Sequence, residues 1–403
     1  MSAPTTVPPP LPKPAHHPWT RPRVRPRAET RHNPSSAGRP RQEDGARLPV
    51  RRSSGYFPPN WFAAAMGTGI VATAAATLPV QVPGQRTFAT TVWVADAVLL
   101  AVLLTATAVH WVRHPQQARA HISHPVISHF YGAPPMAMLT VGAGALLVGR
   151  DVVGAHTAVL IDAVLWVAGT LTGLISAVVV PYYAFTRHRY EPASPFGGWL
   201  MPIVPPMVSA STGALLVPHT APGQWRTTLL LGCYSLFGFS LLASLVIITL
   251  IWGRLMQHKV GAAAAVPTLW IVLGPLGQSI TAAGLLSKAA AGVLPATEVQ
   301  ATNGFALLYG LGTWGFAVLW FAVATALTLR TLRSGLPFSL TWWSFTFPVG
   351  TVVTGTSGLA ARTGLHLFTV TAAGLYVVLL LAWLLVATRT ARGALNGTLL
   401  VPA

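Results

Sequence analysis

The feature that most constrains this chain is a series of apolar runs, each long enough to cross a lipid bilayer. A helix of about 20 apolar residues spans the hydrocarbon core. Breaks in the pattern give ten such runs, at residues 57–79, 90–112, 126–149, 155–185, 196–217, 225–253, 266–288, 302–330, 337–361 and 364–388. Only 8% of the residues are charged, against about 25% in soluble domains. The sequence therefore predicts an all-α membrane protein with ten transmembrane helices.

The beginning of the chain differs from the rest in composition. Residues 1–54 are rich in proline and arginine and poor in large aliphatic residues, so we expect a disordered tail. A membrane domain of residues 55–390 and a short second tail of residues 391–403 follow. The net charge of +18 does not predict nucleic-acid binding, because the basic residues lie in the first tail and at the ends of the apolar runs. Such residues set topology or contact lipid headgroups.

The charges beside the apolar runs predict an orientation. Ten Lys and Arg residues lie on one side of the predicted membrane and five on the other, and residues 1–54 join the richer side. The positive-inside rule therefore places both tails in the cytoplasm. The 26 basic side chains outside histidine are nearly all arginine, which is typical of a GC-rich bacterial genome. We therefore expect a multi-pass protein of a bacterial cytoplasmic membrane.

Odd-numbered and even-numbered runs differ in composition. The third run contains YGAPPMAMLTVGAGALL, the fifth MPIVPPMVSASTGALL, the seventh LGPLGQSITAAGLL and the ninth FPVGTVVTGTSGLA. In each, a proline is followed by hydroxyl or amide residues and then by glycine, and Pro135, Pro206, Pro275 and Pro348 recur at intervals of 71, 69 and 73 residues. The even-numbered runs are mostly Leu, Val, Ala and Trp. This pattern predicts five helical hairpins, each of about 70 residues.

The recurring prolines indicate where the odd-numbered helices lie. A proline inside a spanning helix frees a carbonyl group that lipid cannot satisfy, so neighbouring helices, hydroxyl groups or water must satisfy it. We therefore expect helix kinks at these prolines, with the odd-numbered helices inside, around a central pore, and the even-numbered helices outside. Close packing of small residues is the alternative for any single helix. Recurrence in register favours the polar path.

Polar groups on the odd-numbered helices are the candidate lining of this pore. The central parts of these helices contain no Lys, Arg, Asp or Glu. Hydroxyl and amide groups bind an anion weakly enough to release it. The candidate lining residues are Thr68, Thr73, Thr140, Ser209, Thr212, Gln278, Ser279, Thr351 and Thr354. Taken singly, each is better explained as a packing residue bonded to its own helix, so the prediction concerns the set.

Charged groups lie at the ends of the runs. Arg119 and His129 near the third run, and Lys288 and Arg362 at the ends of the seventh and ninth, are candidates for drawing anions into vestibules. Topology anchoring explains Lys288 and Arg362 equally well. The histidines between residues 110 and 129 have no carboxylate or thiolate partners in the sequence nearby, so we expect no metal site and no cofactor.

Two acidic residues lie within the runs. Asp96 is near the start of its run, and we expect its carboxylate to reach the membrane interface. Asp162 lies deeper, and we expect it to tie two hairpins together rather than to carry a proton.

Three stretches of sequence resemble one family. PNWFAAAMGTGIVA (59–72), HPVISHFYGAPPMAM (124–138) and WWSFTFPVG (342–350) are similar to the tellurite-resistance/dicarboxylate transporter family, and the resemblance covers residues 56–390. That family includes the plant slow anion channel, the fungal malate permease and the fungal sulfite efflux pump, and the MGTG stretch is nearer to the malate and sulfite branch. The resemblance implies five helical hairpins around a central pore, and a homotrimer with one pore per subunit.

The resemblance also implies a gate. In channel members of the family a phenylalanine on the ninth helix closes the pore, and Phe347 is the best match here, with Phe345 as second choice. Phe347, Thr351, Thr354 and Gly358 lie at i, i+4, i+7 and i+11, on one stripe of a helix. A bulky ring at the head of a hydroxyl stripe can close a narrow path. Packing is the alternative role for Phe347.

These features predict transport rather than catalysis. The resemblance implies a channel or proton-coupled carrier for small anions: C4-dicarboxylates such as malate, or sulfite, chloride, nitrate or tellurite. A membrane-embedded sensor or enzyme without net transport is the alternative. An enzyme would need a convergent set of catalytic groups, and the chain contains no HExxH, CxxC or nucleophile-elbow motif.

Overall fold

The structure is a computed structural model that describes residues 56–399. Within this range the chain is helical and has no strand, which confirms the all-α prediction. The long helices are α2 (Gln85–Arg113), α6 (Ala155–Arg187), α8 (Gln224–His258), α10 (Ala296–Arg333) and α12 (His366–Leu395). The predicted tail of residues 1–54 lies outside the described residues. Because α12 continues past residue 390, the second predicted tail begins as helix.

Shorter α-helices alternate with the long ones. They are α1 (Phe62–Thr77), α4 (Ala133–Gly144), α7 (Pro205–Leu216), α9 (Leu273–Ala290) and α11 (Phe347–Thr363). A 3-10 segment precedes each of them: η1 (Pro59–Trp61), η2 (Ile127–Gly132), η4 (Gly197–Leu200), η6 (Ala263–Val272) and η7 (Leu340–Phe345). The remaining elements are α3 (Pro115–Ser123), the π-helical turn η3 (Ala145–Gly149), α5 (Arg150–Val153) and η5 (Val217–His219).

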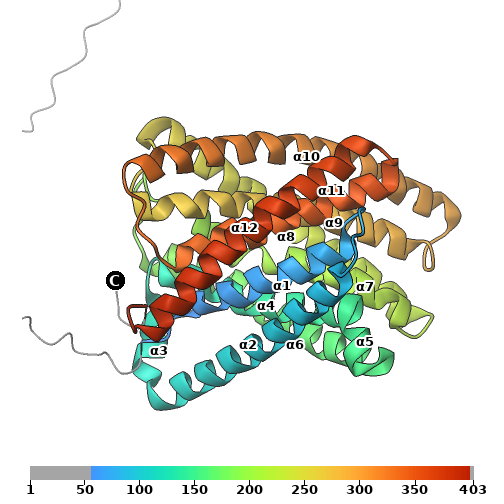
Figure 1. The fold of residues 1–403 in the computed structure, drawn as a ribbon, viewed down its shortest axis with the longest axis horizontal. Helices are drawn as coiled ribbons and strands as arrows, with labels where there is room; N and C mark the ends of the chain where they lie inside the picture. The colour runs from blue at the N-terminus through green and yellow to red at the C-terminus, as the bar shows by residue number, and fades with distance from the viewer. Residues whose placement is uncertain (1–55, 400–403) are drawn as a thin grey trace, which may run out of the picture. The chain divides into compact units, whose positions relative to one another are not determined.

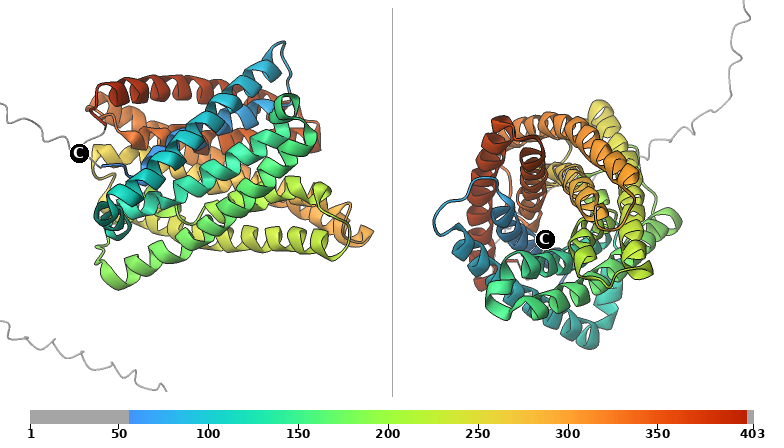
Figure 2. Two further views of the ribbon diagram at one scale, coloured as in Figure 1. Left: turned by 90° about the horizontal axis from the view of Figure 1, so that it is seen from below. Right: turned by 90° about the vertical axis from the view of Figure 1, so that its right-hand side faces the viewer.

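The helices of residues 56–399 form two layers. The end-on view in Figure 2 shows the short helices inside a ring of long ones, and in Figure 1 α1 lies beside α2 and α12, which it contacts. Nearly every side chain of α1, α4, α7 and α11 is buried. The long helices instead expose apolar side chains such as Val98 and Val178. A helix that is apolar all round belongs in an interior, so the outer layer separates the inner helices from lipid.

Seven stretches of helix in the described chain are long and apolar enough to cross a membrane. They are the five long helices, the segment Ile127–Val153 that contains α4, and the segment Ala263–Ala290 that contains α9. The inner helices α1, α7 and α11, with 16, 12 and 17 residues, are too short for this on their own. The structure is therefore that of a multi-pass helical membrane protein.

The recurring prolines lie where a 3-10 segment changes into an α-helix. Pro206 and Pro348 occupy the second position of α7 and α11, and Pro135 and Pro275 the third position of α4 and α9. They do not interrupt a continuous α-helix, so the predicted kink is a change of helix type. A proline fits the first α-helical turn, where its missing N–H leaves little unsatisfied. The carbonyl of Ile203, three residues before Pro206, accepts instead from the Ser240 hydroxyl of α8 at 2.7 Å.

Tryptophan side chains connect the outer layer to the inner layer. The indole N–H of Trp93 on α2 donates to the carbonyl of Val141 on α4 at 2.9 Å. On α6, Trp166 donates in the same way to Ser209 on α7, also at 2.9 Å. An indole has one donor and needs one acceptor when it is buried. These bonds fix the rotation of α4 and α7 against their outer neighbours.

The two acidic residues within the spans are sealed inside the protein. Asp96 on α2 and Asp162 on α6 have no exposed surface, and their carboxylate oxygens have no hydrogen-bond partner among residues 56–399. Asp96 lies against Gly69, and Asp162 against Gly142 of α4. The expectation that Asp96 reaches the interface is wrong, because α1 and α4 cover it. Asp162 forms no hydrogen-bonded tie between hairpins.

Candidate functional site

A cavity of about 100 Å³ lies at the centre of the inner layer. All five inner helices border it, together with η3. The lining residues are Ile70, Thr73, Thr77, Thr140, Ala143, Leu147, Val208, Ser211, Thr212, Leu215, Gln278, Thr281, Leu285, Phe347 and Thr354. None of these side chains is ionisable. The site is therefore a small interior space with neutral walls.

The lining follows the helical repeat on each inner helix. On α9, Gln278, Thr281 and Leu285 lie at i, i+3 and i+7, which is one face of an α-helix. Residues 70, 73 and 77 on α1 and residues 140, 143 and 147 on α4 and η3 have the same spacing. Each inner helix thus turns a single face, with one or more hydroxyl or amide groups, toward the cavity.

The structure separates the predicted lining residues into two groups. Thr73, Thr140, Thr212, Gln278 and Thr354 border the cavity together. The hydroxyl groups of Thr140 and Thr212 each donate to a carbonyl of their own helix, at 2.7 and 2.9 Å. An anion in the cavity would replace the carbonyl oxygen as the acceptor of each hydroxyl proton. The net gain is small, because one hydrogen bond is lost for each one formed, so binding would be weak and reversible.

The other predicted lining residues face neighbouring helices. Thr68 accepts from Trp383 of α12 at 3.1 Å. Ser209 accepts from Thr170 of α6 at 3.0 Å, and Ser279 accepts from Tyr309 of α10 at 2.7 Å. The hydroxyl of Thr351 donates to the carbonyl of Pro348 at 2.7 Å and also reaches that of Leu273 on α9. The hydroxyl groups of Thr68, Ser209 and Ser279 join the inner layer to the outer layer, whereas that of Thr351 joins two inner helices.

Three polar residues of the cavity were not predicted: Thr77, Ser211 and Thr281. The amide of Gln278 donates to the hydroxyl of Ser211, so a single bond joins α9 to α7 across the wall. Helical spacing could have found two of them. Thr281 lies three residues after Gln278, and Thr77 lies four residues after Thr73.

Phe347 borders one end of the cavity. Its ring is 2% exposed and also borders a second cavity of about 20 Å³, room for about one water. The second cavity lies among Met136, Val204 and Gly274, at the first turns of the inner helices. Phe347 is the one residue common to both linings. Phe345 lies elsewhere, with its ring edge-on to Trp270 at 5.3 Å.

The opposite end of the central cavity leads to a vestibule of about 710 Å³. Thr77, Thr281, Leu285 and Thr354 border both spaces. Lys288 and Arg362 line the vestibule. The guanidinium group of Arg362 donates to the side-chain oxygen of Asn303 at 3.0 Å, whereas Lys288 is exposed.

The other predicted vestibule residues do not border these spaces. Arg119 is exposed on α3, and the ring of His129 packs against Phe196 and Trp199 at 5.7 and 6.2 Å. Neither residue lines the central cavity, the smaller cavity or the vestibule. His129 is a packing residue because aromatic rings cover it on two sides.

Similar proteins with curated names are transporters. A sulfite efflux pump of Arthroderma otae is 28% identical over 365 residues, which cover 88% of this chain and 96% of that protein. An uncharacterized transporter of Methanocaldococcus jannaschii is 26% identical and covers 85% and 96%. A malic acid transport protein of Schizosaccharomyces pombe is 21% identical and covers 75% and 70%. These names indicate a transporter rather than an enzyme.

The organisms of these relatives contradict the predicted location. The arginine-rich composition predicted a bacterial cytoplasmic membrane, whereas the relatives named as sulfite or malic acid transporters are fungal. Those relatives suggest a eukaryotic plasma membrane instead. The prediction failed because arginine content follows the base composition of a genome, which is not a property of bacteria alone. The multi-pass part of the prediction stands.

A comparison with protein families covers nearly the whole of the described chain. The profile described as voltage-dependent anion channel matches residues 56–391, which is almost the range over which the three stretches resemble the same family. That match confirms the resemblance. The chain therefore belongs to the voltage-dependent anion channel family.

Proposed function

We propose that this anion transporter moves its substrate through the central cavity and that Phe347 closes the path. One observation carries the proposal. Hydroxyl and amide groups from all five inner helices surround a cavity without an ionisable side chain, and an aromatic ring stands at its closed end. The vestibule with Lys288 and Arg362 continues the path on the other side.

Neutral walls suit release as well as binding. A fixed cation 4 Å from an anion would attract it by about 4 kcal/mol even at an effective dielectric constant of 20. A single neutral hydrogen bond contributes about 1 kcal/mol net. A set of hydroxyl groups therefore replaces part of the hydration shell without trapping the ion. Lys288 and Arg362 raise the anion concentration in the vestibule, where water screens their charge.

Sulfite is the first substrate that we propose. Curated sulfite efflux pumps match this chain at 28 and 27% identity, whereas the malic acid transport protein matches at 21%. A compact oxyanion also fits a cavity of about 100 Å³ with less rearrangement than a dicarboxylate. C4-dicarboxylates such as malate come second, and chloride and nitrate complete the test set.

The gate is tested by shortening its ring. In proteoliposomes, Phe347→Ala should raise sulfite flux several-fold, because removing the ring joins the two cavities at this residue. Phe345→Ala is the matched control. It removes the same aromatic ring two residues earlier in the chain, where the ring packs on Trp270. Flux is counted per folded protein after size-exclusion chromatography. Equal flux for wild type and Phe347→Ala would exclude Phe347 as the gate.

Substrate and coupling are tested on the wild-type protein. Flux of sulfite, malate, nitrate and chloride is measured with and without a pH gradient. A channel conducts along the anion gradient alone, whereas a proton-coupled carrier accumulates its anion when only a pH gradient is applied. No flux of any of the four anions would exclude the proposed substrates, independently of the gate.

We also propose that α1, α7 and α11 complete ten crossings in five hairpins. Each continues a 3-10 segment, and α7 with η4 and η5 extends from Gly197 to His219. Cysteines introduced at Glu191 and Pro222, before and after α7, should react with an impermeant reagent from opposite sides of the membrane. The native Cys233 is fully buried and adds little background. Labelling of both positions from the same side would exclude a crossing by α7.

We also propose that the protein forms the homotrimer that the resemblance implies. Its subunits would each contain a complete path, because the central cavity is built from one chain. Mass photometry in detergent should show three copies per particle. A particle mass of one or two copies would exclude the trimer without affecting the path.

A further inference from the structure

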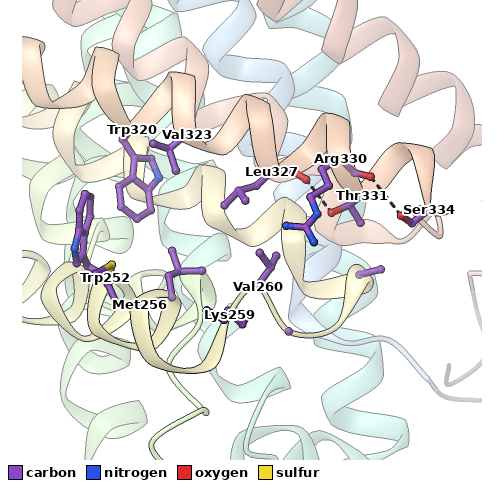
Figure 3. Close-up of a pocket in the computed structure, with 13 residues that line it drawn as sticks. Trp252, Met256, Lys259, Val260, Trp320, Val323, Leu327, Arg330, Thr331 and Ser334 are labelled. Carbon is purple, nitrogen blue, oxygen red and sulfur yellow. Dashed lines mark hydrogen bonds between the residues drawn. The ribbon is translucent and has the colours of Figure 1, made fainter.

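A groove of about 800 Å³ lies between α8 and α10, away from the central cavity. Figure 3 shows its two walls, with Trp252 and Met256 on α8 and Val323 and Leu327 on α10. The rings of Trp252 and Trp320 approach to 5.9 Å and form its apolar end. Met256 is 70% exposed and Trp252 is 42% exposed. The groove is therefore open along the outer surface of the bundle.

The groove changes from apolar to basic along its length. On α10 its lining runs from Trp320 through Leu327 to Arg330 and Ser334, a distance of about 20 Å at 1.5 Å per residue. That length exceeds half of a hydrocarbon core about 30 Å thick. If the basic end lies among the headgroups, a groove of this length therefore reaches the depth of the acyl chains at its apolar end.

Two cations form the basic end of the groove. Lys259 follows the last turn of α8, and Arg330 lies in the last turns of α10. Both are exposed, and neither has a carboxylate partner, because the one ion pair among residues 56–399 joins Arg86 to Asp151. Two like charges without a protein counter-charge suit a negatively charged ligand.

The backbone holds Lys259 in an unusual conformation. Its φ of 65° is the one left-handed value at a non-glycine residue in the described chain, and such a conformation is disfavoured for a long side chain. Arg254 fixes the loop by donating to the carbonyl of Val260 at 2.7 Å. This bond holds the loop at the groove, which Lys259 and Val260 both line.

We propose that this groove binds an anionic phospholipid. Lys259 and Arg330 would contact the headgroup phosphate, and one acyl chain would lie along Met256, Val323 and Leu327 toward Trp252. A transported oxyanion has the charge but no apolar part, and a neutral lipid has the chain but no net charge. An anionic lipid matches both ends. Each cation near the surface adds affinity for anionic lipid.

Native mass spectrometry in neutral detergent tests the site. The full-length protein is titrated with phosphatidylglycerol and with phosphatidylcholine of the same acyl chains. We expect phosphatidylglycerol to bind about thirtyfold more tightly, as two cations predict. The Lys259→Asn/Arg330→Gln variant should lose that preference. Both substitutions remove a positive charge and keep a polar side chain.

Arg333→Gln is the matched control. Arg333 is an exposed arginine in the last turn of α10, but it does not line the groove. It should keep the wild-type preference for phosphatidylglycerol. Equal binding of the two lipids by the wild-type protein would overturn the proposal. An equal loss of the preference for phosphatidylglycerol in Arg333→Gln and in the double variant would also overturn it, because the preference would then come from overall charge.

Two further arms distinguish other occupants. Glycerol phosphate has the headgroup charge without an acyl chain and should not raise the melting temperature, whereas phosphatidylglycerol should. A Met256→Cys variant tests whether a second copy covers the groove, since Met256 lies in its open part. Cross-linking of copies through this cysteine, or stabilisation by glycerol phosphate alone, would overturn the lipid assignment.

Discussion

The hydroxyl of Thr281 on α9 lies 2.8 Å from the hydroxyl of Thr354 on α11. Both residues border the central cavity and the vestibule. Each hydroxyl also reaches a carbonyl of its own helix, at 3.1 Å for Thr281 and 3.0 Å for Thr354. The pair therefore lies where the central cavity meets the vestibule.

We expect Thr281→Val and Thr354→Val to lower sulfite flux about fivefold each, as losing a hydrogen bond of roughly 1 kcal/mol implies. The double variant should lose less than the sum, because the two hydroxyl groups act as one unit. Flux is measured in proteoliposomes. The control is Thr172→Val, whose hydroxyl bonds only within the outer helix α6. Additive losses would show that the two groups act separately.

Close contact between α9 and α11 gives a second prediction. A Cβ on Gly277 would overlap the backbone of Thr351 and Val352, which cannot move as a side chain can. Gly277→Ala should therefore destabilise the protein by about 1–3 kcal/mol through overpacking. Gly284→Ala on the same helix has nothing within 4 Å of the new Cβ and should be neutral or slightly stabilising. Melting temperatures of the two variants in detergent compare them directly.

The sequence indicated which helices are inner and which are outer better than it indicated which face of an inner helix borders the cavity. Even-numbered runs have one lipid-facing side, and the odd-numbered runs contain the prolines and hydroxyl groups, so the inner and outer helices could be separated. The rotation of an inner helix is different. Nearly all residues of α7 are buried, so no polar face reveals its orientation. Ser209 and Ser211 lie two residues apart, on opposite faces of the helix, and only Ser211 borders the cavity.

The sequence shows where the prolines lie, but it does not show what form the break in the helix takes at each of them. A proline predicts a break in α-helical hydrogen bonding, and the sequence does not show which side of the break is α-helical. Here the 3-10 segments before Pro206 and Pro348 allow each proline to occupy the first α-helical turn. The burial of Asp96 was also not predictable from its position in the run, because part of its cover comes from α4, a helix outside its own hairpin.

Asp96 gives a third prediction. Its carboxylate has no exposed surface and no donor among residues 56–399, so a charge there would have no compensation. Asparagine has the same shape and no charge, and Asp96→Asn should be at least as stable as wild type. Gly69→Ala should cost about 1–3 kcal/mol, because its Cβ would overlap Asp96 and Thr140. A marked loss of melting temperature in Asp96→Asn would instead indicate a bound cation or proton donor.

His121 gives a prediction about pH. It lies on α3, outside the membrane-spanning helices, with Tyr56 and His110 each 5.5 Å from its ring. Burial, followed by the charges of His110 and His124, lowers the pKa of His121 from 6.5 to about 4. The unfolded chain therefore takes up a proton at a higher pH than the folded protein does. This contribution to stability is complete above pH 6.5 and falls progressively as the pH drops toward 4.

The free energy of unfolding should fall by about 1–2 kcal/mol between pH 7 and pH 4, after allowance for solvent screening of the full shift. His121→Gln cannot take up the proton and should flatten this part of the pH profile. Melting temperatures measured in detergent across that range provide the test. His156→Gln removes an exposed histidine at the start of α6 and should keep the wild-type slope. If His121→Gln also keeps that slope, a different group causes the acid sensitivity.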